Sequence, residues 1–336
     1  MLRVSCAWLR RLRSLLHRGF QISFRHNMHL DVVIPTYNRS TLLKKAISSL
    51  LTARMPAELS MKIIVVDNNS TDDTKAVISD AVQRSNGRVS YVFEKRQGRS
   101  PALNAGIAAA TGDLIGFIDD DEEIDESWYE TILSAFKNNR LDFIGGPYVP
   151  RFESELPEWL PKDHAAVVGI VDGGDKVVAF DETYPGILMG GNAVFTREVL
   201  QRVGPYSTSL GRSGTRLLSC EDEDMYQRLR AAGARGLYLP QLIVYHFIPR
   251  ERLTKRYHRS WCFWQSVSSA VLDRIRPQPT AYVFGVPRYF YGRALRGMLR
   301  LVNVWNREPA SRFSNELSLW DLAGFFYGKH FYRPDS

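Results

Sequence analysis

Short runs of apolar residues alternate with amphipathic segments through the first third of the chain. The runs cover residues 31–34, 63–66, 89–93 and 114–118, and turn-forming residues follow them. Between the runs, apolar residues recur every three or four positions, which is typical of helices with one buried face. Continuous apolar strands separated by helices predict a mostly parallel sheet covered on both faces. The expected fold class is therefore α/β, with a Rossmann-like sheet.

Capping residues predict where the helices begin. Ser40 or Thr41 is expected to cap the first helix, and Thr71 the second. Pro101 is expected at the first position of the third helix. Ligands of such sheets bind at the carboxyl ends of the strands, so the loops after these strands are the expected binding site.

The pattern is less regular beyond residue 145. Residues 145–190 predict loops and short strands, and residues 204–219, rich in Gly, Ser and Arg, predict a mobile loop. The remaining predicted elements are a helix over 196–203 ended by Gly204, a helix over 221–232, a strand over 237–245 leading to His246, and helices over 252–273 and 288–305.

Charge is distributed unevenly over the 336 residues. Residues 1–30 carry +6 and residues 247–307 carry +10, so the remainder of this +8 chain carries −8. An acidic centre could hold a cation, and basic ends could meet phosphate groups. No apolar window reaches the length of a membrane-spanning helix. The chain has three cysteines, an odd number, and their spacing is not typical of disulfide pairs. This favours a reducing compartment.

The first 28 residues are open to three interpretations. Leucines and Phe20 form a helical apolar stripe with Arg between them, which could lie on a membrane surface or serve as an Arg-rich targeting peptide. Alternatively, translation starts at Met28. Three segments are thus expected: a basic extension over 1–28, a catalytic domain over 29–250, and a helical, basic and aromatic region over 251–336.

Two acidic clusters carry the candidate chemistry. Asp119, Asp120 and Asp121 directly follow an apolar strand, where carboxylates suit Mg²⁺ or Mn²⁺ and the phosphates such a metal would bridge. Glu221 and Asp222 open a predicted helix; such residues often only complement the helix dipole. A carboxylate fixed at a helix start after a mobile loop is also a plausible general base.

The ordered set of motifs resembles family 2 glycosyltransferases of the GT-A fold. The matching stretches are 33–39 (VIPTYNR), 65–72 (VVDNNSTD), 98–106 (GRSPALNAG), 112–121, 190–192 and 221–222. Together with His246 they extend over residues 31–246 in the family's order. One stretch alone would be weak evidence, whereas the ordered set is specific.

The resemblance implies a role for each matched residue. It assigns to the nucleotide-sugar site Pro35, Tyr37, Arg39, Asp67, Asn69, Arg99, Asn104, Asp119, Asp120, Gly190 and Gly191. Asp119 and Asp121 match the DxD motif that binds the metal, and His246 falls where relatives often keep a histidine near it; an ordinary strand-end histidine explains His246 equally well. Asp222 matches the catalytic base, with Glu221 beside it. Two positions depart from the family pattern, Leu103 in place of Arg and Cys220 in place of Gly.

The implied activity is inverting transfer of a sugar from a nucleotide-diphosphate sugar to a hydroxyl of a saccharide or lipid-linked acceptor, in polysaccharide or glycolipid assembly. The cofactor would be Mg²⁺ or Mn²⁺. A sugar nucleotidyltransferase is an alternative, but its Gly-rich motif should follow the first strand, whereas residues 214–217 lie far downstream. A second alternative is a non-catalytic sugar- or lipid-binding protein on the same fold.

The basic C-terminal region predicts peripheral association with an anionic membrane at its cytoplasmic face. Residues 247–307 interleave Arg with aromatic side chains, a composition that settles at lipid head groups. The opposing interpretation is that these aromatic residues pack onto the catalytic core. No nucleic-acid partner is expected, since no recognised motif accompanies the basic ends.

Overall fold

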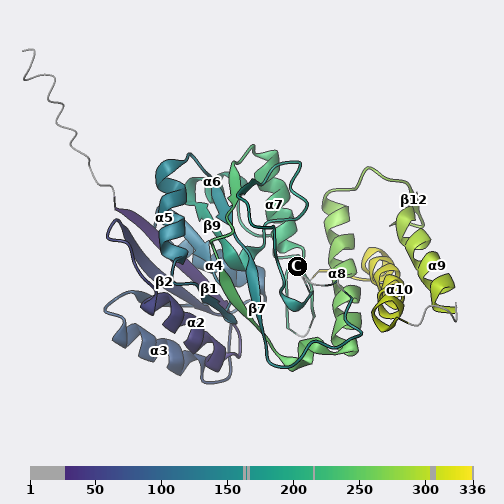
Figure 1. Cartoon of the computed structure of the whole chain (residues 1–336), viewed down its shortest axis with the longest axis horizontal. Coiled ribbons are helices and arrows are strands. Elements are labelled where there is room, and N and C mark those ends of the chain that lie inside the picture. The colour runs from purple at the N-terminus through teal and green to yellow at the C-terminus, as the bar shows by residue number, and fades with distance from the viewer. Residues whose placement is uncertain (1–26, 162–163, 165–166, 215, 303–307, 335–336) are drawn as a thin grey trace, which may run out of the picture.

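The computed structural model describes residues 27–161, 164, 167–214, 216–302 and 308–334. The interpretations of residues 1–28 therefore fall almost entirely outside the described residues. An eight-stranded sheet forms the centre of the larger half of the molecule (Figure 1). In spatial order its strands are β3 (Val89–Phe93), β2 (Leu59–Asp67), β1 (Met28–Thr36), β4 (Leu114–Phe117), β9 (Ala193–Thr196), β6 (Phe143–Gly145), β10 (Gly236–Tyr238) and β8 (Val178–Ala179).

The sheet is mostly parallel, as the sequence predicts. β3, β2, β1 and β4 run parallel to one another, and β6 is parallel to β10. β9 is antiparallel to both of its neighbours, and β8 is an antiparallel edge strand. The order places β1 and β4 side by side, so the loops that follow these two strands open at the same edge of the sheet.

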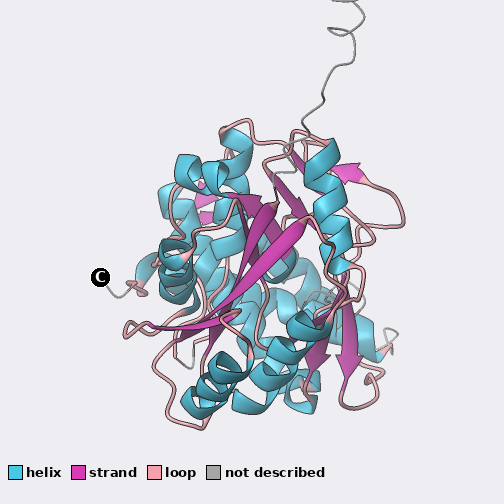
Figure 2. Ribbon diagram, turned by 90° about the vertical axis from the view of Figure 1, so that its left-hand side faces the viewer, coloured by secondary structure: helices cyan, strands magenta, loops and turns pink. Residues whose placement is uncertain are grey.

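Helices cover both faces of the sheet, because side chains alternate between two hydrophobic clusters. Along β1, Val32 and Ile34 enter one cluster and Val33 enters the other. The first cluster is closed by α2 (Ser40–Thr52), α3 (Thr74–Arg84) and α5 (Trp128–Asn138), and the second by α4 (Arg99–Ala109), α6 (Arg197–Val203) and α7 (Glu221–Ala231). Figure 2 shows the strands enclosed between these helices.

The predicted caps of the first helices were wrong. α2 begins at Ser40, but the carboxylate of Asp72 accepts from the Ser40 backbone N–H at 3.1 Å. The other oxygen of Asp72 accepts from the N–H of Thr74, the first residue of α3. One aspartate therefore serves both helix starts, a long-range arrangement that local capping patterns do not reveal. Pro101 is the third residue of α4 rather than its first.

A second, three-stranded sheet lies beside the first and consists of β5 (Glu122–Ile124), β11 (Val244–Ile248) and β7 (Tyr148–Phe152). The single strand expected over 237–245 is instead two strands, β10 and β11, separated by a turn. His246 consequently lies in the middle of β11, in register with Glu122 of β5. The small sheet brings this histidine to the acidic loop.

The C-terminal region packs directly on the catalytic half. It comprises α8 (Lys255–Ile275), a hairpin of β12 (Tyr282–Val283) and β13 (Val286–Pro287), α9 (Arg288–Val302) and α10 (Pro309–His330). Val267 and Val271 of α8 share a cluster with Leu218 and Cys220. No helix in the described part of the chain is long and apolar enough to cross a membrane.

Helix α10 was not predicted; its contact with α8 combines apolar residues, such as Phe313 and Leu317 beside Cys262, with two glycines. A Cβ atom at Gly324 would collide with the backbone of Phe263, and one at Gly328 would lie 2.9 Å from the backbone of Val267. The two glycines allow the helices to approach closely. Short 3₁₀ helices at Gly190–Asn192 and Arg250–Leu253 complete the described elements used below.

Candidate active site

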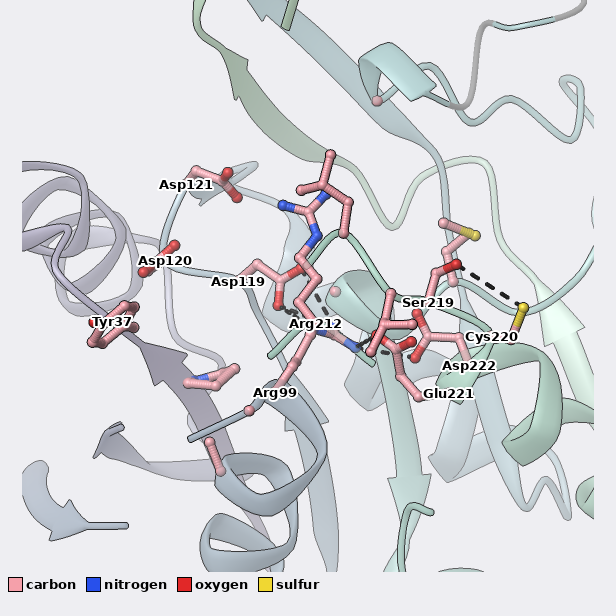
Figure 3. A pocket seen from close by; sticks show the side chains of 18 of the residues that line it. Tyr37, Arg99, Asp119, Asp120, Asp121, Arg212, Ser219, Cys220, Glu221 and Asp222 are labelled. Carbon is pink, nitrogen blue, oxygen red and sulfur yellow. Dashed lines mark hydrogen bonds and ion pairs between the residues drawn. The ribbon is translucent and has the colours of Figure 1, made fainter. Parts of the chain in front are cut away.

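A cleft of about 610 Å³ opens at the carboxyl ends of β1 and β4. Most of the predicted site residues line it, although they come from six separate segments of the chain: Pro35, Tyr37, Arg39, Arg99, Asp119, Asp120, Asp121, Gly191, Glu221, Asp222 and His246. Figure 3 shows the acidic loop on one side of this cleft and the start of α7 on the other. The volume is within the usual range of small-molecule sites.

The acidic loop is held in place by its own backbone and by β1. The backbone N–H of Asp119 donates to the carboxylate of Glu122 at 2.9 Å, and the hydroxyl of Thr36 donates to Asp120 at 2.8 Å. Burial, together with the negative charge of Asp121, raises the pKa of Asp120 to about 6, although Arg39 opposes this shift. The loop is therefore a fixed set of carboxylates rather than a solvated turn.

Asp121 is surrounded by basic side chains. One of its oxygens accepts from Arg39 at 2.8 Å and from Arg252 at 3.0 Å, and the other lies 3.4 Å from Nε2 of His246. Burial alone would raise the pKa of this carboxyl, but His246 and Arg252 hold it well below its usual range. Asp121 is thus a buried, ionised carboxylate.

Arg99 joins the two sides of the cleft. It is the first residue of α4, and its side chain is only 14% exposed. Its guanidinium donates to Asp119 at 3.0 Å, to Glu221 at 3.0 Å and to Asp222 at 3.2 Å. A single arginine therefore bridges the DxD motif and the two candidate catalytic carboxylates, Glu221 and Asp222, which lie more than 100 residues further along the sequence.

Asp222 is oriented by a backbone group as well as by Arg99. Its second oxygen accepts from the N–H of Gly190 at 3.0 Å. A Cβ atom at Gly190 would collide with this carboxylate, so the close approach requires glycine. Asp222 lies in the first turn of α7, at the positive end of the helix dipole.

Glu221 is more deeply buried than its neighbour Asp222. Burial and the adjacent charge of Asp222 raise the pKa of Glu221 to about 7, with Arg99 opposing the shift. Cys220, which precedes it, adopts a left-handed conformation with φ of 70°. The glycine common in the family at this position would adopt that conformation without strain.

The carboxylate oxygens at the acidic loop are suitable ligands for a hard divalent cation. Asp119 and Asp121 supply carboxylate oxygens, and Oε1 of buried Glu122 has no hydrogen-bond partner. Within the described ranges, no group of three or more His, Cys, Asp or Glu side chains is already arranged around a metal position. Such a site suits a cation like Mg²⁺, which takes one or two carboxylates from the protein and completes its shell with substrate phosphates and water.

Four predicted residues do not line the cleft. Gly190 lies behind Asp222, as described above. Asp67 accepts from the hydroxyl of Tyr91 at 3.1 Å, and Asn104 is bonded through both ends of its amide to the backbone of Tyr206. Asn69 is exposed and has φ of 66°. The side chain that holds this turn is that of Asp67, which also accepts from the N–H of Ser70 at 2.9 Å. Asn68 ties the turn to the loop after β3, because its oxygen accepts from the N–H of Gly98 at 2.7 Å.

The sequence pattern also missed several residues of the cleft. Arg252, assigned above to the C-terminal region, is 7% exposed and bonds both Asp121 and His246. A domain boundary at residue 250 therefore cuts through the site. Trp261 and Gln265 of α8 line the far wall. The cleft also contains Arg212, whose guanidinium donates to the hydroxyl of Tyr257 at 3.5 Å. No sequence signal distinguishes Arg252, Trp261 and Gln265 from other residues of the basic, aromatic segment, or Arg212 from the other arginines of its loop.

Comparison with known proteins identifies related sequences. The model of glycosyl transferase family 2 matches residues 31–204. The glucosyl-dolichyl phosphate glucuronosyltransferase of Haloferax volcanii is 29% identical over 262 residues, 75% of this chain and 79% of that protein. The succinoglycan biosynthesis protein ExoM of Rhizobium meliloti is 26% identical over 239 residues, 69% of this chain and 73% of that protein.

Solved structures share the fold. A mannosyltransferase from Pyrobaculum calidifontis, in complex with GDP-Man and Mn²⁺, superposes with a TM-score of 0.55 at 18% identity, covering 96% of this chain and 80% of that one. GalNAc-T7 with UDP, GalNAc and Mn²⁺ gives 0.54 at 18% identity, over 75% of this chain and 52% of that one. At this identity the likeness establishes the fold, and the predicted GT-A architecture is confirmed.

Proposed function

As this chain belongs to glycosyltransferase family 2 and is a glycosyltransferase, we propose that it transfers a sugar from a nucleotide-diphosphate sugar to an acceptor hydroxyl with inversion, using Asp222 as the base. The observation that carries this proposal is the position of Asp222. It faces the same cleft as the DxD motif, and both Gly190 and Arg99 hold its carboxylate. Membership of this family also argues against the alternative that the chain is a sugar nucleotidyltransferase.

The donor binds along the strand ends in this proposal. Tyr37, 41% exposed at the cleft, offers a ring face to the nucleotide base, and Pro35 and Arg39 continue that wall. Arg99 and Arg212 are the cations of the cleft best placed for the diphosphate, since guanidinium groups bind phosphate oxygens through paired hydrogen bonds. Gly191 leaves room beside Asp119, because a Cβ there would lie 2.9 Å from its carboxylate.

The proposed cofactor is Mg²⁺ or Mn²⁺ held by Asp119 and Asp121, with His246 close to Asp121. Both solved relatives described above contain Mn²⁺. When bound, the ion would offset the negative charge that develops on the departing diphosphate. Arg39 and Arg252 fix the orientation of Asp121, and Thr36 and Arg39 fix that of Asp120.

Asp222 supplies the proton acceptor for the reaction. As the acceptor oxygen forms its bond to the anomeric carbon, its proton passes to the carboxylate of Asp222. The bond between the anomeric carbon and the phosphate oxygen breaks, and the nucleoside diphosphate leaves with the electron pair. Attack from the face opposite the leaving group inverts the anomeric configuration.

The acceptor is proposed to be a saccharide or a lipid-linked glycan presented at a membrane. Some relatives are named for lipid-linked acceptors, including the dolichyl phosphate enzyme above and a Campylobacter jejuni glucosyltransferase named for an undecaprenol-linked acceptor, 36% identical over 34% of this chain. We assign the protein to the cytoplasmic face of that membrane, consistent with its unpaired cysteine pattern.

A donor screen tests the proposed function. Purified protein is incubated with Mn²⁺ and UDP-, GDP- or dTDP-sugars, together with a panel of soluble and lipid-linked acceptors, and nucleoside diphosphate release is measured. One donor should give release that depends on an acceptor, and NMR of the product should show the inverted anomer. Retention of configuration would contradict the role of Asp222 as base.

A further inference from the structure

Helix α9 has two apolar faces, of which the structure covers one. The covered face carries Phe290, Ala294 and Gly297 and packs against α10, with the rings of Phe290 and Phe325 4.7 Å apart. On another face, Leu295, Leu299 and Val302 are 54%, 59% and 72% exposed. Each of these residues follows a covered one by five positions, which is roughly 140° around a helix.

The exposed face is a continuous stripe rather than scattered residues. Leu295, Leu299 and Val302 have the spacing i, i+4, i+7, and Met298, 50% exposed, lies beside them. An isolated exposed leucine needs no explanation, but a contiguous apolar stripe on a surface helix marks an interaction surface. We call these four residues, with Arg296 and Arg300, the α9 face.

Positive charge accompanies the stripe. Arg296 and Arg300 are exposed and make no ion pair within the described part of the chain, whereas Arg293 pairs with Asp321 at 2.9 Å. Residues 288–302 contain no Asp or Glu. Apolar side chains flanked by arginine, without acidic residues, are typical of helices that lie in the head-group layer of an anionic bilayer.

The neighbouring hairpin adds an exposed aromatic side chain. Phe284, between β12 and β13, is 80% exposed and has φ of 46°, a conformation that disfavours bulky residues. Figure 1 places β12 next to α9, at the end of the molecule away from the main sheet. Aromatic rings are enriched at the bilayer interface.

We propose that the α9 face is the surface through which this enzyme binds an anionic lipid bilayer, with α9 lying in the interface plane. A second copy of the chain fits less well, because a symmetric contact through this face would bring the unpaired arginines of both copies together. The membrane location assumed for the acceptor rests on the proposed function, whereas the binding surface rests on the exposure and charge of the α9 face itself.

The test is co-sedimentation of the full chain with phosphatidylcholine vesicles that contain or lack phosphatidylglycerol. The wild type should bind the anionic vesicles at low salt and lose much of this binding at high salt. Two double variants should each bind the anionic vesicles roughly tenfold more weakly than the wild type. They are Leu295→Glu/Leu299→Glu, which removes apolar side chains, and Arg296→Gln/Arg300→Gln, which removes positive charge. Val177→Glu and Leu156→Glu, at other exposed apolar positions, are the matched controls and should bind as the wild type does.

Two further measurements separate this proposal from the proposed function. Turnover with a soluble acceptor should be unchanged in both α9 variants, so a loss of vesicle binding with normal turnover supports the surface alone. Circular dichroism checks that each variant is folded. Wild-type protein that stays in the supernatant, or α9 variants that bind as tightly as the controls, would overturn the proposal. A wild-type dimer that the glutamate variant converts to a monomer, without vesicle binding, would assign the face to a second copy instead.

Discussion

The backbone N–H of Gly190 donates to Oδ2 of Asp222 at 3.0 Å, across 32 residues of sequence. This bond fixes the carboxylate that the proposed reaction needs as a base. The N–H can approach because Gly190 has no side chain, and a Cβ atom would occupy the space of the carboxylate. In the proposed mechanism, Gly190 would therefore act through the position of Asp222.

Gly190→Ala should displace Asp222 and lower turnover by about 100-fold, since misplacement of a catalytic group by an ångström has costs of that order. Donor affinity should change much less. The measurement is steady-state kinetics together with nucleoside diphosphate binding. Gly292→Ala is the control, because a Cβ there meets only the end of the Arg296 side chain at 3.6 Å. Equal turnover of the two variants would contradict the positioning role.

Excess EDTA should abolish turnover, and Mn²⁺ or Mg²⁺ should restore it. Asp121→Asn should remove most activity and weaken donor binding in the presence of metal, because it removes one proposed ligand. Asp125→Asn is the matched control, since Asp125 is not among the residues that line the cleft. Full turnover in EDTA would exclude metal dependence.

Arg99→Met should destabilise the free protein by about 3 kcal/mol or more, because it leaves buried carboxylates without their shared counter-ion. The structure predicts a rescue: Mn²⁺ alone should raise the melting temperature of this variant more than that of the wild type, since the ion supplies positive charge beside Asp119. Thermal unfolding with and without Mn²⁺ provides the measurement. An equal shift in both proteins would argue against a metal next to Arg99.

Glu221 makes stability depend on pH in a predictable direction. Its pKa in the folded protein is raised to about 7, so the fold favours the protonated form. The corresponding stabilisation is fully present below the unfolded pKa near 4.5 and is lost as pH rises through 7. Relative to Glu221→Gln, the wild type should therefore lose up to about 3 kcal/mol between pH 4.5 and 8. Urea unfolding in EDTA measures this difference, and a constant difference across that range would refute the shift.

The apolar runs were sufficient to predict the strands β1, β2 and β4, because strands buried on both faces leave little ambiguity in sequence. The edge strand β3 was also predicted, although its Tyr91 and Phe93 are exposed. The acidic loop could also be placed, since Asp119 directly follows such a run. The hydrogen-bond partners that hold the site could not be predicted from the sequence. Asp72 accepts from the first residues of two helices, and Arg252 donates to Asp121 across 131 residues. The periodicity of apolar residues gives no information on such contacts.

The second half was harder because its elements are defined by tertiary packing. The turn between β10 and β11 interrupts what looks like one strand and moves His246 into the small sheet. Helix α10 depends on Gly324 and Gly328, residues that usually weaken a helix prediction. In contrast, the short helix α6 carries local signals: Gly204 ends the helix with φ of 80°, as predicted, and Thr196, expected as the first helical residue, caps it by accepting from the N–H of Val199 at 3.2 Å.

The central claim is that Asp222 is the base of an inverting sugar transfer. The most direct test is Asp222→Asn, in which the amide oxygen can still accept from Gly190 while the group no longer takes up a proton. Donor binding by calorimetry and single-turnover transfer are measured on the same folded protein. We predict donor affinity close to that of the wild type and transfer reduced by about 100-fold or more. Near-normal transfer by the well-folded variant would contradict the assignment of Asp222 as the base.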